Sequence, residues 1–89
     1  MIVKVDKNFE KDTNKIKNSL LLNKIANCLE TVQRAKTIHQ IPKIKKLKGF
    51  EQIYRIRIGD YRLGIYINDD VVEFIRCLHR KDIYKYFPK

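Results

Sequence analysis

The stretch YRIRIGDYRLG, residues 54–64, decides the fold class of this chain. Apolar and polar residues alternate on both sides of a Gly59-Asp60 pair, which is the pattern of two antiparallel strands joined by a tight turn. If these two residues form the whole loop, every pairing in the hairpin is fixed, because side chains alternate strictly between the two faces of a strand. One face then carries six residues able to pack on a hydrophobic core: Tyr54, Ile56, Ile58, Tyr61, Leu63 and Ile65.

The opposite face of this hairpin carries arginines. The predicted register places Arg57 directly opposite Arg62, and Arg55 opposite Gly64. Like charges that face each other across a ladder destabilise a sheet, and a glycine within a strand often marks the close approach of another group. A solvated outer face is the ordinary explanation for polar residues on an antiparallel sheet. The alternative is that this face meets an anionic ligand, for which Gly64 would leave room.

The charge distribution favours the second explanation. The 89-residue chain has a formal net charge of +10, and a domain this basic is typical of proteins that bind polyanions. Its 14 lysines are scattered along the chain, whereas five of its six arginines lie within residues 55–80. Arginine binds phosphate through two parallel hydrogen bonds and stacks on bases, and lysine does not replace it there. The clustering of arginine therefore indicates a site.

The composition also excludes several classes of protein. A chain that is 44% hydrophobic and 34% charged is expected to form one soluble, globular domain over residues 1–89. Its longest apolar run, residues 20–22, is far too short to span a membrane, and its N-terminus lacks a signal-peptide pattern, so we expect a cytoplasmic protein. Cys28 and Cys77 lack metal-binding spacing and are expected to be buried free thiols.

Strands and helices can be assigned on both sides of the hairpin. Residues 2–5 predict a short strand, and two helices follow, the first capped by Asn8 and the second by Ser19. Residues 43–49 predict a short basic strand, and VVEFIRCLHR, residues 71–80, predicts a long one. The predicted fold class is α+β: an N-terminal strand and a two-helix hairpin packed on one face of a small, mainly antiparallel, three- to four-stranded sheet. The face that carries the arginines is predicted to stay open.

The face on which Arg76 lies depends on the turn before it. A two-residue loop would set Arg76 opposite Leu63 on the core side, where an unpaired charge is costly. A three-residue loop over residues 68–70 sets it opposite Arg62 instead. We predict the longer loop, although Glu73 then lies on the face that the helices cover.

The segment RCLHRKDIYKYF, residues 76–87, adds His79, Arg80 and Tyr84 close to the arginines in sequence. Histidine can move a proton near neutral pH, arginine stabilises charge in phosphoryl transfer, and tyrosine can stack on a base. A lone histidine is more often structural, and aromatic residues in a tail usually pack against the sheet. Together with the basic face, the set suits RNA. We find no carboxylate pair for a metal and no cofactor motif, which favours metal-free cleavage by the RNA 2′-hydroxyl.

Residues 46–87 resemble the RelE/ParE superfamily of toxins from type II toxin–antitoxin modules. The resemblance rests on a K-L-x-G motif, then Y-R-I-R-x-G-D-Y-R, then an H-R-x-D-I-Y ending. It implies a compact toxin whose RelE-like members cut mRNA in the ribosomal A site without a metal or another cofactor. It also implies the partners: mRNA, the ribosome and a cognate antitoxin protein that wraps the toxin, with no membrane and no small molecule.

The resemblance also implies roles for individual residues. Arg55 and Arg57 stand at the two basic positions of the first strand of the hairpin, and Arg62 stands at the arginine that steadies the scissile phosphate. Arg80 matches an arginine proposed to protonate the leaving oxygen, and Tyr84 matches a tyrosine that stacks on a base.

Two choices stay open. The segment from Arg80 to Tyr84 is shorter than in the best-studied branch of the superfamily, so His79 is a second candidate for the acid or base. The expected catalytic residues are Arg57, Arg62, His79, Arg80 and Tyr84, and the expected substrate-binding residues are Lys48, Arg55 and Arg76. The alternatives to a nuclease are a ParE-like inhibitor of DNA gyrase and a member that binds only nucleic acid or an antitoxin. The histidine–arginine pair with the tyrosine favours the nuclease.

Overall fold

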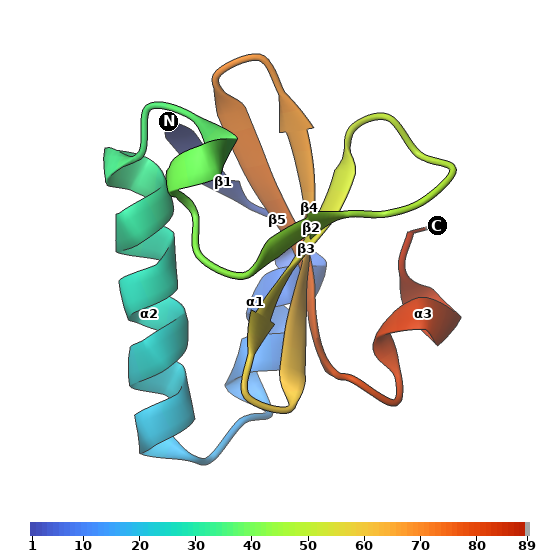
Figure 1. The fold of residues 1–89 in the computed structure, drawn as a ribbon. Coiled ribbons are helices and arrows are strands. Elements are labelled where there is room, and N and C mark those ends of the chain that lie inside the picture. The colour runs from blue at the N-terminus through green and yellow to red at the C-terminus, as the bar shows by residue number, and fades with distance from the viewer. Residues whose placement is uncertain (89) are drawn as a thin grey trace.

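The computed structural model describes residues 1–88 of the chain, and its elements follow one another as a strand, two helices, four strands and a short final helix (Figure 1). They are β1 (Ile2–Val5), α1 (Lys7–Asn14), α2 (Ser19–Arg34), a 3₁₀ helix (Ile38–Gln40), β2 (Ile44–Lys46), β3 (Ile53–Ile58), β4 (Tyr61–Asn68), β5 (Val71–His79) and α3 (Ile83–Tyr86). Within this part of the chain, no helix is long and apolar enough to cross a membrane.

The strands form one mixed sheet in the order β1-β5-β4-β3-β2. β1 runs parallel to β5, and the other neighbours are antiparallel. The predicted α+β class is confirmed, although the described residues form five strands rather than three or four. The prediction was too low because β1 and the short β2 join the sheet as its two edges. β2 is also shorter than the predicted range of residues 43–49.

Both long helices begin at a polar residue just before the predicted cap. Asp6 caps α1 by accepting a hydrogen bond from the backbone N–H of Asn8, at 2.9 Å. Asn18 caps α2 in the same way through the N–H of Leu21, at 3.1 Å. Asp, Asn and Ser are similarly strong N-cap residues, so residue type alone could not decide between Asp6 and Asn8 or between Asn18 and Ser19.

The helices α1 and α2 cover one face of the sheet and bury the core there. Phe9 of α1 packs edge-on against Phe74 of β5, with ring centroids 5.4 Å apart. Cys77 is buried in this core and Cys28 is half-buried in α2, and both are free thiols as predicted. The other fully or nearly fully buried members of the core are Ile25, Val32, Ala35, Ile41, Ile56, Leu63, Ile65, Ile67 and Val72.

The hairpin quoted at the outset forms with the predicted register. Gly59 and Asp60 make the loop, and Gly59 takes a φ of 57°, which glycine adopts at little cost. Arg57 pairs with Arg62 across the ladder, as expected. The two side chains share the face of the sheet opposite the core.

The turn between β4 and β5 differs from the prediction. Asn68 pairs with Val71, so the loop has two residues rather than three, and Asp69 lies in the left-handed region with a φ of 53°. Asp and Asn tolerate this conformation better than most residues. The predicted pairing of Arg62 with Arg76 is therefore wrong.

A β-bulge shifts the register further along β5. Ile65 pairs with Phe74, but its neighbour Gly64 pairs with Arg76, so one residue of β5 stands unpaired between them. The bulge turns Arg76 away from the core face, which avoids the burial of an unpaired charge. Glu73, predicted on the helix-covered face, lies on the other one, because it alternates with the buried Phe74.

The face predicted to stay open is partly covered by the tail. After β5 the chain turns back, and Figure 1 shows α3 on the side of the sheet opposite α2. Ile83 and Phe87 of the tail are buried. The ring of Phe87 lies over Gly64, where an added Cβ would come within 2.7 Å of it. Gly64 therefore leaves room for Phe87 and not for a ligand, which corrects the expectation from the sequence.

Candidate functional site

Arg62 is held by the hairpin turn beside it. Its Nη1 donates hydrogen bonds to the carbonyl oxygens of Gly59, at 2.9 Å, and Tyr61, at 3.0 Å. Within residues 1–88, neither bond uses Nη2 or Nε of this side chain. A guanidinium presents its donors in a fixed planar fork, so anchoring one nitrogen orients the others. The turn therefore orients the Arg62 guanidinium while its Nη2 and Nε take no part in these two hydrogen bonds.

Other predicted site residues gather around this guanidinium. The pKa of Arg62 is lowered, first by partial burial and then by the positive charges of Arg55 and Arg57. Arg80 contributes in the same direction, and the Tyr84 hydroxyl acts in the opposite one. We call these five residues the arginine patch. Like charges disfavour one another's charged form, and a bound polyanion would relieve this repulsion.

The position of Arg80 depends on the same turn. Its backbone N–H donates to the carbonyl oxygen of Asp60 at 2.7 Å, which ties the end of β5 to the hairpin loop. Its Nε also lies 3.8 Å from an oxygen of the Asp60 carboxylate. Both side chains are largely exposed, so this ion pair contributes little to stability. The backbone contact holds Arg80 at the hairpin loop, whose Gly59 carbonyl also anchors Arg62.

A groove of about 610 Å³ borders the arginine patch on the same side of the sheet. It brings together Lys48, Arg55 and Tyr84, three of the residues that the sequence singled out. We call it the basic groove, because four of its lining side chains are cationic and none is acidic. Its lining residues are Lys45, Lys46, Leu47, Lys48, Phe50, Arg55, Tyr84, Phe87 and Pro88.

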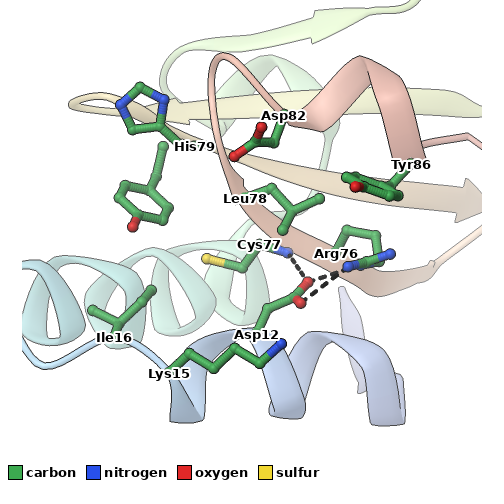
Figure 2. A pocket seen from close by; sticks show the side chains of 10 residues that line it. Asp12, Lys15, Ile16, Arg76, Cys77, Leu78, His79, Asp82 and Tyr86 are labelled. Atoms are coloured by element: carbon green, nitrogen blue, oxygen red, sulfur yellow. Dashed lines mark hydrogen bonds and ion pairs between the residues drawn. The ribbon is translucent and has the colours of Figure 1, made fainter.

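His79 lies away from this site. It pairs with Tyr61 at the end of the β4–β5 ladder, and their rings meet edge to face with centroids 5.7 Å apart. This pair points to the same face as the buried pair Leu63–Cys77, which is the face that the helices cover. Arg62 points to the other face. The sheet therefore separates His79 from the arginine patch, and Figure 2 shows it at the rim of a different pocket, above α1.

Arg76 is also placed outside the basic groove. Its guanidinium donates two hydrogen bonds to the carboxylate of Asp12, at 2.8 and 3.1 Å, and Figure 2 shows this pair from close by. Its Cζ also lies 5.6 Å from the ring centroid of Tyr86 in α3. The hydrogen bonds to Asp12 raise the pKa of Arg76 more than burial lowers it. Arg76 thus joins α1, β5 and α3.

Asp12 is the residue that sequence reasoning missed. Its carboxylate is 5% exposed and accepts a third hydrogen bond from the backbone N–H of Cys77, at 2.9 Å. One signal was available: Asp12 follows Phe9 by three residues and so shares the core-facing side of α1. A carboxylate on that side needs a buried partner. Within the described residues, no three His, Cys, Asp or Glu side chains lie close enough to hold a metal ion.

Comparisons with known proteins show the family to which the chain belongs. Residues 3–84 match the family described as the ParE toxin of type II toxin–antitoxin system, parDE. The chain is 41% identical over 83 residues to Toxin RelE3 of Methanocaldococcus jannaschii, and the match covers 92% of this chain and 93% of that protein.

Solved structures show the same relationship. A chain of the RelB-RelE antitoxin-toxin complex from Methanococcus jannaschii superposes with a TM-score of 0.81 at 39% identity, over 96% of this chain and 99% of that one. The YoeB dimer from Staphylococcus aureus matches with a TM-score of 0.72 at 19% identity, over 89% and 95% of the two chains, which is a likeness of fold alone. The chain belongs to the ParE toxin family of type II toxin–antitoxin systems, and it stands on the RelE-like side of the RelE/ParE superfamily, as its motifs predicted.

Proposed function

We propose that this toxin is an endoribonuclease that cuts messenger RNA on the ribosome and thereby blocks translation. The observation that carries the proposal is the arginine patch: Arg57 pairs with Arg62 across the ladder, and the anchored guanidinium of Arg62 lies in the field of Arg55, Arg57 and Arg80. Such a patch fits a substrate whose charge increases during the reaction. The similarity to a protein named Toxin RelE3 supports the RelE-like activity over the gyrase-directed one.

The proposed reaction uses the RNA itself as the nucleophile and needs no metal. The 2′-oxygen of one nucleotide gives its proton to a solvent water and forms a bond to the neighbouring phosphorus, while the bond from phosphorus to the 5′-oxygen of the next nucleotide breaks. The 5′-oxygen gains a proton and leaves as a hydroxyl, so a cyclic 2′,3′-phosphate remains. Negative charge builds up on the phosphoryl oxygens between these events, where arginine stabilises it most.

Each residue of the arginine patch has a role in this proposal. Arg62 holds the scissile phosphate with the donors that the turn leaves available. Arg57 and Arg55 neutralise the developing charge, and Arg80 donates to the leaving 5′-oxygen. Tyr84, which is 60% exposed, offers its ring to a base. Between the two candidates for the acid, the geometry supports Arg80 over the histidine on the far side of the sheet.

The proposal includes the partners of the protein. The solved relative with the TM-score of 0.81 is a toxin bound to its antitoxin, and a cognate antitoxin is accordingly a partner of this chain. We propose mRNA and the translating ribosome as the targets, and the cytoplasm as the place of action. The net charge of +10 supports a ribosomal target, because it would speed the approach to RNA.

Induction of the protein in growing cells tests the proposal. Translation should stop first, and mapped mRNA should carry new breaks within translated coding regions. An Arg62→Ala variant at matched abundance is the control and should leave mRNA whole. If DNA breaks and a damage response come first while translated mRNA stays whole, the protein is a gyrase poison and the proposal is wrong.

A further inference from the structure

An exposed phenylalanine lies in the basic groove and has no part in the chemistry proposed above. Phe50, in the loop between β2 and β3, is 46% exposed. We propose that Phe50 is a second platform for base stacking, so that the groove holds single-stranded RNA by one base on Tyr84 and another on Phe50. This inference rests on the proposed function and names the part of the RNA that the groove would recognise.

The loop before β3 directs Phe50 into the groove and away from the core. The backbone N–H of Phe50 donates to the carbonyl oxygen of Leu47, at 3.2 Å, and closes a four-residue turn. The third residue of this turn, Gly49, has a φ of 87°, which only glycine adopts readily. The N–H of Leu47 in turn donates to the carbonyl oxygen of Ile53 and anchors the loop to the sheet, at 2.9 Å. A short, anchored turn therefore presents the ring.

A single exposed phenylalanine needs no explanation by itself, and its surroundings are what point to a ligand. The side chains that line the groove with it include the cations Lys45, Lys46, Lys48 and Arg55, and no acidic residue. A partner that suits both features has an anionic backbone and flat apolar groups. Single-stranded nucleic acid has both, whereas the bases of a duplex are already stacked and paired.

The groove and the arginine patch are continuous, so one strand of RNA can reach both. Arg55 lines the groove and also lowers the pKa of Arg62 through its charge. Tyr84 likewise belongs to both surfaces. Phe50 lines the groove but does not take part in the patch. The RNA is therefore expected to pass from Arg62, along Arg55 and Tyr84, to Phe50, which contacts a base away from the scissile phosphate.

The test measures binding of a short, single-stranded RNA with 2′-O-methyl groups, which the protein cannot cleave by the proposed reaction. A 2-aminopurine base in the RNA reports stacking through loss of its fluorescence. Phe50→Ala should weaken binding about 5- to 150-fold, the equivalent of the 1–3 kcal/mol that one base–aromatic stack contributes, and should restore the fluorescence. Phe50→Leu should show the same loss, because it keeps an apolar side chain without a ring, and Phe50→Trp should bind like the wild type.

The matched control is Leu20→Ala, which removes a 63% exposed apolar side chain at the start of α2, outside the groove. It should bind RNA like the wild type. The inference is overturned if Phe50→Ala binds within twofold of the wild type, if Phe50→Leu does, or if the wild type does not bind this RNA. Each of these results leaves the proposed function to its own test, because breaks in cellular mRNA are mapped independently of binding to this RNA.

Discussion

Removal of the Asp12 carboxylate is predicted to destabilise the protein more than the loss of any surface charge. In Asp12→Ala, the guanidinium of Arg76 loses two hydrogen bonds and the N–H of Cys77 loses its acceptor. Breaking a buried ion pair from one side costs about 3–5 kcal/mol. The Arg76 side chain is 22% exposed and can reach water, so we expect the lower end, about 3 kcal/mol. The total free energy of unfolding of a domain of this size is about 4–13 kcal/mol.

Urea unfolding followed by circular dichroism measures this loss. The matched control is Glu30→Ala, which breaks an ion pair between side chains that are 67% and 77% exposed. The free energy of unfolding of that variant should fall by less than about 0.5 kcal/mol, because exposed ion pairs within a helix contribute little. The reasoning is refuted if the free energy of unfolding of Asp12→Ala lies within about 1 kcal/mol of that of the wild type. It would mean that Arg76 finds other partners in the fold.

Three further predictions concern the tail, the histidine and the thiols. Tyr84→Ala should slow mRNA cleavage more than Tyr84→Phe, since stacking needs only the ring; equal defects would point to the hydroxyl. His79→Gln should cut mRNA at nearly the wild-type rate, because the sheet lies between it and the arginine patch; a large loss in rate would restore its place as the acid. Burial raises the pKa of Cys28 to about 11 and that of Cys77 to about 12. The folded protein therefore keeps protons that the unfolded chain releases above pH 9.0, and its free energy of unfolding should fall as the pH rises from there in a urea series. A flat profile would mean that the thiols are accessible.

The parts of the fold that the sequence predicts correctly are those decided by neighbours along the chain. The hairpin at Gly59-Asp60 follows from alternation and turn chemistry, and both are local. The bulge beside Gly64 has no such local signal, because it depends on how Arg76 meets Asp12, 64 residues away. The cost of burying an unpaired charge still predicted the correct face for Arg76. The extra residue was predicted in the loop, whereas it lies inside β5 as the bulge.

The site residues also fall into those that the local sequence places correctly and those that it does not. Arg55, Arg57 and Arg62 follow from the hairpin register alone, and the structure places them together. His79 stands three residues after Arg76 in β5, so strand alternation puts the two on opposite faces, and the face predicted for Arg76 already implied this. Closeness in sequence to Arg80 hid that implication. The tail over Gly64 was unpredictable, because a ring that fills the space above a glycine leaves no pattern in the glycine's own strand.

Cleavage of mRNA on purified, translating ribosomes tests the central claim most directly. The wild-type protein should cut the message without added factors, and Arg62→Ala should cut about 10²–10³ times more slowly, the usual effect of losing one group that stabilises transition-state charge. The variant should melt like the wild type, because the Arg62 side chain points away from the core and, among residues 1–88, its hydrogen bonds go to its own turn. The account is contradicted if wild-type protein leaves the message whole, or if Arg62→Ala cuts it at the wild-type rate.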